Sequence, residues 1–419
     1  MRTKEHHIAL KNVGKLNPES IEDYISAGGY DGIRQAVRRE PKEIVGSIVD
    51  SGLLGRGGGG FSAGLKEQFT SEACISCDER FVVCNADEGE PGTFKDRIIM
   101  ENDPHRYIEG MLIAGWAIMA TRGFIYLRAE YTTAIERTYK ALQTVRDAGL
   151  LGDNILDTGW SFDIELRKGA GSYLCGEELT MLESLEGKRG YPRIKPPFPA
   201  EKGLWGMPTL INNVETFAHM PAIICNGTEW YRSLGVGNST GTKLFTISGN
   251  VNSPGCYEAE MGVTLRQLLE EYADGMKPGK SFKAALLGGA AGTFVDHSML
   301  DFGMGFDTLK EHGATLGSGA VIVIDEDQSI REILYNILRF FAHESCGKCI
   351  PCRVGTSQLL VQMDRVGVSE NGNDEALSGL ARQAEVMART SLCPLGQSPI
   401  LPIRSALKYF RSELDGKQG

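Results

Sequence analysis

The segment FVVCNADEGEPG, at residues 81–92, joins a short apolar run to an acidic loop that contains two glycines. The apolar half has the length and the Phe/Val composition of a buried strand. Three carboxylates and the amide of Asn85 follow it, at the position where open α/β sheets bind their ligands. The segment therefore predicts a sheet with a polar ligand site at the carboxyl end of a strand. The alternative is a solvated acidic turn.

The sequence beyond this strand alternates between helical and extended patterns. Residues 104–121 and 133–148 carry apolar side chains at helical intervals, which predicts two helices. Residues 123–127 and 161–166 predict two further strands. This alternation is typical of parallel βαβ units joined by right-handed crossovers.

The C-terminal half predicts two further structural units. Residues 243–248 and 320–325 predict strands and residues 265–272 predict a helix, which together indicate a small α+β module. Beyond them the pattern is helical, most clearly at residues 330–343, so a helical bundle is expected. A chain of 419 residues is too long for one core. The predicted domains are residues 1–240, 241–326 and 327–419.

Composition and charge exclude several classes of function. The formal net charge of −10 argues against non-specific nucleic-acid binding, which needs a basic face. The most apolar stretch, residues 111–120, is too short for a membrane-spanning helix of ~20 residues, so no direct membrane span is expected. Residues 1–10 have neither a secretory h-region nor an Arg/Ser-rich presequence. In the cytosolic protein expected on these grounds, ten cysteines indicate metal or redox chemistry rather than disulfides.

Three of the cysteines lie in ESCGKCIPCR, residues 344–353, with the spacing C-x2-C-x2-C, and a fourth lies in LCP at residues 392–394. Two-residue gaps let three thiolates from one loop bind three corners of a [4Fe–4S] cubane, while a remote cysteine binds the fourth iron. Structural zinc sites usually present two separate C-x2-C pairs instead, so the spacing favours the cubane over zinc or over four unrelated thiols. Cys74 and Cys77 form an isolated pair and are interpreted as free thiols. The predicted ligands are Cys346, Cys349, Cys352 and Cys393.

A glycine-rich loop, GRGGGGF at residues 55–61, formally contains G-x-G-x-x-G. It follows a helical pattern at residues 41–50 rather than a strand, and it lacks the Gly-Lys-Ser/Thr ending of a P-loop, so the motif alone is a weak signal. Its backbone N–H groups could form an anion nest, with Arg56 and Lys66 adding charge for a phosphate or ribityl group. The alternative is a flexible surface loop.

Three further segments could line the same site. GSYLCGEE, residues 171–178, follows a predicted strand, and INNVET, residues 211–216, offers two adjacent amides for a polar ring system. The segment IKPPFP, residues 194–199, is stiff because proline fixes φ. It could hold Phe198 as a stacking platform or serve as a linker.

Taken in order, these segments resemble the family of the NADH-binding flavoprotein subunit (51 kDa type) of respiratory complex I, the NADH:quinone oxidoreductase. The resemblance spans nearly the whole chain. It implies an α/β protein with α+β and all-α parts: a Rossmann-like FMN domain, a β-grasp-like middle domain of the soluble-ligand-binding kind, and a C-terminal helical bundle that carries the [4Fe–4S] cluster. The motifs are GRGGGGF at residue 55, NADEGEPG at 85, YLCGEE at 173, PPFPA at 196, INNVET at 211, and ESCGKCIPCR at 344 with LCPLG at 392.

The resemblance also implies which residues hold FMN and NAD(H). NADH would stack on the flavin, with its adenine among three phenylalanines, and Glu90 is expected to be the catalytic residue. The residues expected around FMN are Gly55, Arg56, Gly57, Gly58, Lys66, Asn85, Asp87, Glu88, Tyr173, Gly176, Glu177, Asn212, Asn213 and Thr216. Those expected around NADH are Phe61, Phe69, Phe198, Glu90, Glu178 and Lys195.

Glu178 is expected to disfavour NADPH, because a carboxylate beside the ribose accepts hydrogen bonds from its hydroxyls and repels a 2′-phosphate. The alternative is that Glu178 only begins the helix predicted at residues 177–185 and interacts with its N-terminal dipole.

The function implied by the resemblance is that of an NADH dehydrogenase. FMN would accept a hydride from NADH, and the [4Fe–4S] cluster would pass single electrons to partner subunits and finally to quinone. The implied partners are a small [2Fe–2S] subunit of thioredoxin-like fold and the large iron–sulfur subunit, with the assembly placing this chain peripherally on the cytoplasmic side of the cell membrane. NAD-reducing hydrogenases and formate dehydrogenases share these motifs, but many carry thioredoxin-like or ferredoxin-like ends that are absent here, which favours complex I. The rival hypothesis is a non-catalytic, zinc-stabilised scaffold joined to a nucleotide-sensing domain.

Overall fold

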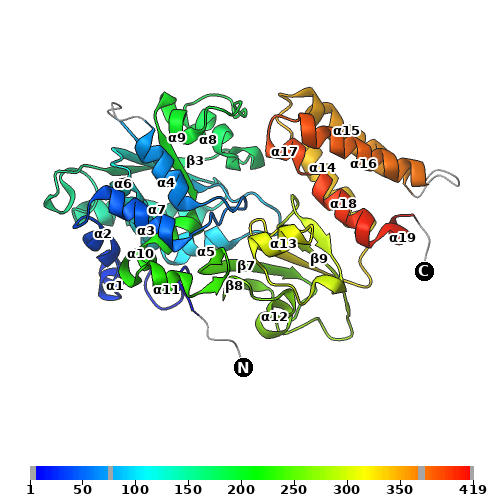
Figure 1. The fold of residues 1–419 in the computed structure, drawn as a ribbon, viewed down its shortest axis with the longest axis horizontal. Helices are drawn as coiled ribbons and strands as arrows, with labels where there is room; N and C mark the ends of the chain where they lie inside the picture. Colours follow the sequence, from blue (N-terminus) through cyan, green and yellow to red (C-terminus); the bar gives the residue numbers. More distant parts are fainter. Residues whose placement is uncertain (1–5, 74–78, 367–372, 416–419) are drawn as a thin grey trace.

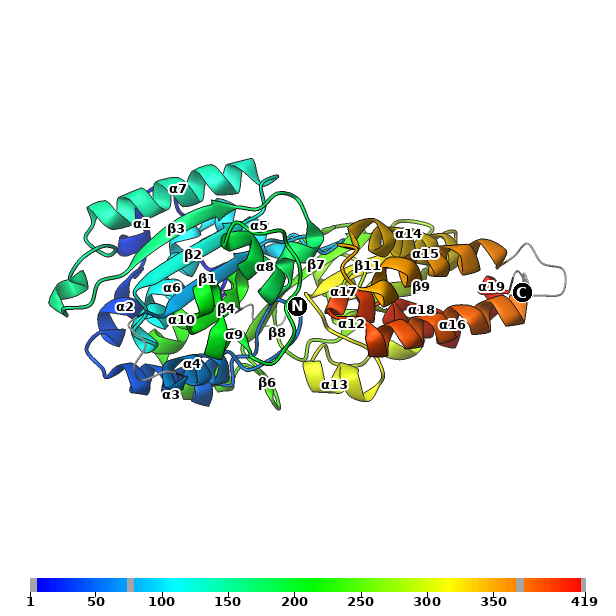
Figure 2. The same cartoon turned by 90° about the horizontal axis from the view of Figure 1, so that it is seen from above.

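The computed structural model describes residues 6–73, 79–366 and 373–415, so Cys74 and Cys77 lie outside the described residues. A four-stranded sheet with its helices forms one end of an elongated molecule, and the C-terminal helices form the other (Figure 1). A five-stranded sheet lies between them (Figure 2). Among the described residues, no helix combines the length and the apolar character that crossing a membrane requires.

The first sheet is entirely parallel and has the strand order β3-β2-β1-β4. The three predicted strands are confirmed, although β3 begins two residues later than expected, and β4 was not predicted from the sequence. The strands are β1 (Phe81–Ala86), β2 (Arg122–Leu127), β3 (Asp163–Lys168) and β4 (Thr209–Asn213).

Helices cover both faces of this sheet. The predicted helices at residues 104–121 and 133–148 correspond to α6 and α7. The helices of this part are α1 (Ile21–Ser26), α2 (Asp31–Ala36), α3 (Pro41–Ser51), α4 (Ala63–Glu72), α5 (Lys95–Asn102), α6 (Pro104–Ala117), α7 (Thr132–Asp147), α8 (Glu178–Leu185), α9 (Pro199–Lys202), α10 (Val214–Asn226) and α11 (Thr228–Arg232).

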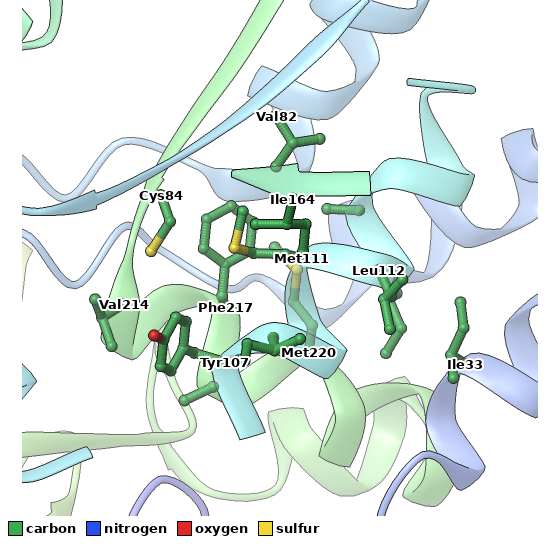
Figure 3. Packing of buried hydrophobic residues seen from close by; sticks show 14 of the residues in the cluster. Ile33, Val82, Cys84, Tyr107, Met111, Leu112, Ile164, Val214, Phe217 and Met220 are labelled. Atoms are coloured by element: carbon green, nitrogen blue, oxygen red, sulfur yellow. The ribbon is translucent and has the colours of Figure 1, made fainter. Parts of the chain in front are cut away.

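Side-chain alternation along β1 explains why the sheet is buried on both sides. Val82 and Cys84 belong to the large core that includes Met111 of α6 and Phe217 of α10 (Figure 3). Phe81 and Val83 belong to a smaller core on the opposite face, together with residues of α8. A parallel sheet requires cover on both faces, and each fully buried aliphatic or aromatic side chain contributes about 1.5–3 kcal/mol to that packing.

The strand order places a topological switch point between β1 and β4. The chain runs outward from β1 to β2 and β3, and it then returns to place β4 on the other side of β1. In open parallel sheets, the crevice at the carboxyl ends of two such strands is where ligands bind. The acidic loop after β1 and the paired amides at the end of β4 therefore meet at one edge.

The second sheet has the order β10-β9-β11-β7-β8, with β11 parallel to β7 and the remaining pairs antiparallel. The strands predicted at residues 243–248 and 320–325 are confirmed as β7 and β11, and a helical segment at residues 265–272 is present. The elements are β7 (Thr242–Gly249), β8 (Gly255–Glu260), α12 (Leu265–Gln267) continued by a π-helical turn (Leu268–Tyr272), β9 (Phe282–Leu287), β10 (Thr293–Val295), α13 (Phe306–Glu311) and β11 (Ala320–Asp325), preceded by a two-stranded ribbon of β5 (Gly235–Val236) and β6 (Ser239–Thr240).

The C-terminal part is helical, as predicted, and it shares a core with the second sheet. Leu286 of β9 and Phe294 of β10 lie in the same apolar cluster as Leu338 and Ile403, and the backbone N–H of Phe294 donates to Oγ of Ser405 at 2.9 Å. The boundary predicted at residue 326 therefore remains a prediction. The helices are α14 (Ile330–Glu344), α15 (Ile350–Arg365), α16 (Asn373–Thr390), α17 (Pro394–Gln397), α18 (Ile400–Tyr409) and α19 (Arg411–Leu414).

The second sheet also holds the N-terminal segment of the chain. The buried carboxylate of Glu258 in β8 accepts hydrogen bonds from three consecutive backbone N–H groups, those of Ile8, Ala9 and Leu10, at 2.8, 3.0 and 2.8 Å. A carboxylate that accepts several N–H groups away from water forms strong, charge-assisted bonds.

Replacing Glu258 with alanine should therefore leave these N–H groups unpaired and lower the free energy of unfolding by about 3 kcal/mol. Glu260, two residues along the same strand, is the matched control, because its pair with His6 at 2.7 Å is half-exposed. Its replacement by alanine should cost less than about 1 kcal/mol. Chemical denaturation of both variants measures the difference, and equal losses would contradict the role given to Glu258.

Candidate functional site

The glycine-rich loop is closed and packed, which argues against the flexible surface loop considered from the sequence. The N–H of Gly55 donates to the carbonyl of Phe61 at 2.8 Å, and the flanking residues form a β-bridge. Gly58 and Gly60 have φ of +139° and +63°, and a Cβ on Gly60 would lie 2.6 Å from the ring of Phe306. Glycine is required here because the backbone is left-handed and closely packed.

Arg56 does not add charge to this loop in the way the sequence suggested. Its side chain is fully buried, and Nη2 donates to the hydroxyl of Tyr231 at 3.2 Å and to the carbonyl of Thr240 at 2.6 Å. Its backbone N–H donates to Oγ1 of Thr216 at 2.9 Å. Arg56 therefore anchors the loop from within the protein, and its predicted contact with FMN stays a prediction.

At the carboxyl end of β1, Asn85 and Asp87 lie beside Gly176. The side-chain amide of Asn85 donates to the carbonyl of Gly176 at 2.8 Å, and a Cβ on Gly176 would lie 3.3 Å from the carbonyl oxygen of Asp87. Burial raises the pKa of Asp87 to about 7, although Arg128 opposes the shift. Oδ2 of Asp87 is buried and has no partner among the described residues, so it is available to a ligand.

At the carboxyl end of β4, the two amides differ in their use. Asn213 caps α10 by accepting the N–H of Glu215 at 3.1 Å, and its Nδ2 donates to Asp96 at 2.6 Å. Asn212 is buried, and its Nδ2 has no partner within the described residues. One unpaired donor, on Asn212 of β4, and one unpaired acceptor, on Asp87 directly after β1, thus lie at the ends of the two strands that flank the switch point.

Glu88, predicted as a cofactor ligand, is used inside the protein. Its carboxylate accepts the backbone N–H groups of Asp96 at 2.9 Å and Arg97 at 3.1 Å, which lie in the first turn of α5. The hydroxyl of Tyr131 also donates to it, at 3.2 Å. Burial, together with the nearby charge of Asp96, raises the pKa of Glu88 to about 7. Its side chain caps a helix beneath the site, so this carboxylate is already used, and the contact of Glu88 with the cofactor stays a prediction.

Glu90 joins three parts of the molecule. It accepts the hydroxyl of Tyr173 at 2.6 Å and the backbone N–H of Ala291 at 3.1 Å, and burial raises its pKa. The backbone N–H of Tyr173 donates to Glu344 of α14 at 3.2 Å, and its ring packs edge-on against Phe340 at 4.9 Å. The predicted catalytic residue is therefore tied through Tyr173 to the helix that leads into the cysteine loop.

Two of the predicted polar contacts to NADH, Glu178 and Lys195, form one charged group with Lys66. Glu178 pairs with Lys66, and Lys195 bridges Glu177 at 3.1 Å and Glu178 at 3.5 Å. Although burial opposes it, these lysines hold the pKa of Glu178 below its usual value. Glu177, rather than Glu178, caps α8 by accepting the N–H groups of Leu179 and Thr180.

Three phenylalanines near this charged group are exposed to an unusual degree. Phe61, Phe69 and Phe198 are 49%, 49% and 54% exposed. Phe61 precedes α4, Phe69 lies on it, and α9, which follows Phe198, packs against α4. Aromatic rings left open on adjacent segments offer a stacking surface for a planar ligand.

The four predicted cluster ligands lie around the start of α15. Cys346 lies in the loop after α14, Cys349 and Cys352 lie at the N-terminus of α15, and Cys393 precedes α17. A Cβ on Gly396 would lie 2.8 Å from Cβ of Cys352, so the segment after Cys393 packs directly on Cys352. Burial raises the pKa of Cys393 to about 12. In the described part of the chain, no three His, Cys, Asp or Glu side chains are grouped as ligands of one ion, and a cubane needs no such group because each thiolate binds a different iron.

Sequence reasoning missed a buried charged cluster beneath the site. Lys95 is fully buried, and its ammonium contacts Asp96 at 2.7 Å, Glu215 at 2.9 Å and Oδ1 of Asn213 at 3.0 Å. The sequence signal for this cluster was the adjacent Lys95 and Asp96, shortly after the acidic loop. Charged side chains are seldom fully buried unless they are paired, so two adjacent opposite charges are compatible with burial.

Three family models match the chain. They are the Nuo51 FMN-binding domain at residues 48–222, the SLBB domain at residues 244–280, and the NADH-ubiquinone oxidoreductase-F iron-sulfur binding region at residues 332–417. The second NADH-quinone oxidoreductase F subunit of Rhizobium meliloti is 44% identical over 97% of this chain and 96% of its own. The corresponding F subunit of Escherichia coli is 42% identical over 99% of this chain and 94% of its own.

The chain belongs to the NADH-quinone oxidoreductase F-subunit family. Members of the wider group serve other enzymes as well. NADP-reducing hydrogenase subunit HndC of Solidesulfovibrio fructosivorans is 43% identical over 98% of this chain and 83% of its own. A solved NAD+-reducing [NiFe]-hydrogenase in the H2-reduced state matches with a TM-score of 0.84 at 34% identity, over 99% of this chain and 67% of that chain.

These matches confirm the predicted cofactors of a protein of this family, FMN and a [4Fe–4S] cluster. The residues present fit both groups. A closed glycine loop, an unpaired amide donor and an unpaired carboxyl oxygen suit a phosphate and a polar ring edge, and four cysteines in a three-plus-one arrangement suit a cubane.

The raised pKa of Asp87 predicts a pH-dependent cost to folding. The pKa of Asp87 is about 7 in the folded state and 3.8 in its ordinary, unfolded environment, so the folded state binds the proton more tightly. The free energy of unfolding therefore falls as the pH rises from 3.8 to about 7. Asp87→Asn should therefore stabilise the FMN-depleted protein by about 1–2 kcal/mol at pH 8, while weakening FMN binding. Thermal melts at pH 8 and pH 5 test this, because the gain should shrink at pH 5, and an equal gain at both values would contradict it.

Proposed function

We propose that this protein oxidises NADH with FMN bound in the crevice between β1 and β4, and that electrons leave through a [4Fe–4S] cluster held by Cys346, Cys349, Cys352 and Cys393. The observation that carries the proposal is the topological switch point, where the glycine loop, the acidic loop and the paired amides meet.

Each part of the site has a distinct task in this proposal. When bound, FMN takes two electrons from NADH as a hydride and releases them singly, which suits a one-electron cluster. The glycine loop supplies backbone N–H donors to the phosphate, and Asn212 supplies an amide donor to the ring edge. Asp87 carries a proton on part of the molecules near pH 7, so it can donate as well as accept a hydrogen bond there.

The residues on the outer side of the crevice would hold the dinucleotide. Phe61, Phe69 and Phe198 offer faces to the adenine, and Lys66 and Lys195 offer charge to the pyrophosphate. Glu90 lies between Tyr173 and Ala291, where it would position the nicotinamide end. None of these roles requires a side chain to act as a nucleophile or general base, because FMN, when bound, would supply the hydride chemistry.

The relatives are subunits of larger enzymes, which supports a function within an assembly. The proposed partners are a small [2Fe–2S] subunit of thioredoxin-like fold and a large iron–sulfur subunit, with quinone as the final acceptor and the assembly on the cytoplasmic side of the membrane. A second candidate is an NAD(P)-linked hydrogenase module, which the likeness to HndC and to the solved hydrogenase supports. Mass spectrometry of subunits that co-purify with the chain decides between the two.

The proposal is tested on protein purified without oxygen. About four iron atoms and about four sulfides per chain are expected, together with FMN that acid precipitation releases. NADH should reduce ferricyanide without membranes or partners, whereas quinone reduction should require the assembly. Zinc in place of iron would support the scaffold hypothesis, and quinone reduction by this chain alone would overturn the partner model.

A further inference from the structure

Lys243, in the second sheet, is fully buried, and its side chain contacts the glycine loop at residues 55–61. It lies on β7, and its Nζ donates to the backbone carbonyl of Arg56 at 3.2 Å and lies 3.6 Å from the carboxylate of Glu215. The next residue, Leu244, donates its backbone N–H to the same carboxylate at 2.7 Å. Two consecutive residues of β7 thus engage the first turn of α10 and the loop.

The loop is held at both backbone polar groups of one residue, Arg56. Thr216, the neighbour of Glu215 on α10, accepts the backbone N–H of Arg56 at 2.9 Å, while Lys243 binds the Arg56 carbonyl. With the guanidinium bound to Tyr231 and Thr240, Arg56 has its donor, its acceptor and its side chain all fixed. The conformation of the following glycines depends on where this residue is held.

The backbone of the second sheet is shaped to admit the lysine. Gly319, just before β11, has φ of +93°, and a Cβ there would lie 2.9 Å from Cε of Lys243 and 3.3 Å from its Nζ. Any other residue at Gly319 would meet both a strained backbone and the lysine chain.

Keeping a lysine at this place is costly, which indicates a specific role. Burial lowers the pKa of Lys243 to about 8, with Glu215 opposing the shift and Lys95 and Arg56 adding to it. Although burial opposes it, Lys243 and Lys95 hold the pKa of Glu215 to about 2. A buried ammonium that is retained beside two other cations is worse for stability than an apolar side chain of similar size.

We propose that Lys243 is a positioning residue of the FMN site: it fixes the Arg56 peptide, and thereby the glycine loop, so that FMN affinity depends on the second sheet. The inference rests on the proposed FMN site at this loop. It assigns the middle module a part in cofactor binding, through one side chain that reaches from its sheet to the glycine loop and to α10.

The test is FMN binding by the full-length chain after reversible removal of the flavin, measured by quenching of FMN fluorescence. Lys243→Met should raise the Kd for FMN about tenfold or more, because it removes the charged donor to the Arg56 carbonyl. Lys243→Gln keeps a neutral donor and should give a smaller increase, and Lys243→Arg should restore part of the affinity. Lys283→Met is the matched control, since Lys283 is a lysine of the same sheet that pairs with Glu413 at 2.8 Å in α19, away from the loop.

Hydrogen exchange supplies the readout that a purely structural role would not give. In Lys243→Met, amides of residues 55–61 should exchange faster while those of β9 and β11 stay protected. If that variant does not fold, Lys243→Gln carries the test. Folded variants that bind FMN within twofold of the unaltered protein, with unchanged exchange in the loop, would overturn the inference. Failure of the unaltered protein to bind FMN would instead overturn the proposed function.

Discussion

Replacing Cys393 with alanine is expected to remove the [4Fe–4S] cluster and to loosen the whole C-terminal bundle. The iron content should fall from about four per chain to well below one, and the melting temperature should drop by about 10 °C, because cluster binding energy is also folding energy. Cys393 is buried within the core of the bundle, and the segment that follows it packs on Cys352. Burial also raises its pKa to about 12, so the thiol keeps its proton unless a metal replaces it.

Cys225→Ala is the control for this experiment, because it removes an exposed thiol far from the cluster in the fold. Its iron, sulfide and melting temperature should match those of the unaltered protein. Iron analysis and the visible absorbance of both variants measure the first effect, and thermal melts measure the second. Retention of a full cluster in Cys393→Ala would remove Cys393 from the ligand set.

Replacing Glu178 with glutamine is expected to shift cofactor preference toward NADPH. The Glu178 carboxylate is paired with Lys66 and Lys195. It therefore repels a 2′-phosphate less strongly than an unpaired carboxylate would. Its removal leaves Lys66 without its carboxylate partner, while Lys195 keeps its pair with Glu177, so Lys66 can then bind the phosphate. The kcat/KM for NADPH relative to NADH should rise about tenfold or more.

The structure also separates the two interpretations of Glu178 that the sequence left open. Glu177 makes the hydrogen bonds that cap α8, so a loss of helix stability is expected for Glu177→Ala rather than for Glu178→Gln. Glu183→Gln is the control on the same helix, where the carboxylate pairs with Arg193 at 2.5 Å. Steady-state kinetics with both nucleotides and a thermal melt of each variant complete the test. An unchanged nucleotide ratio for Glu178→Gln would exclude it from the site.

The sequence predicted those elements whose signal is local. Strands β1 and β2 carry apolar runs, and the segment that contains β3 alternates apolar and polar residues. Three of the four cysteine ligands follow from spacing within one loop. Strand β4, with the sequence TLINN, was missed because only two apolar residues precede the amides that end it. Strand β10 was missed because its three residues are too few to show a periodic pattern, and β9, which pairs with it and with β11, was not predicted either.

Side-chain roles were predicted less well than positions, because a role depends on partners far along the chain. Arg56 lies in the glycine loop as expected, yet its guanidinium donates hydrogen bonds to Tyr231 and Thr240 inside the protein. Glu88 follows β1 as expected, yet it caps α5. In both cases the sequence indicates the loop correctly but cannot tell which side chains face outward, since that is fixed only when the helices and the second sheet pack.

The core shared by the second sheet and the bundle makes these two parts inseparable in a thermodynamic sense. Phe294 and Leu286 from the sheet are buried by Leu338 and Ile403 from the helices, so a fragment cut near residue 326 would expose an apolar surface on each piece. Calorimetry should then register one cooperative transition for both parts rather than two. Loss of the cluster should therefore also destabilise the second sheet, which carries Lys243. We accordingly expect FMN to dissociate after the iron is lost.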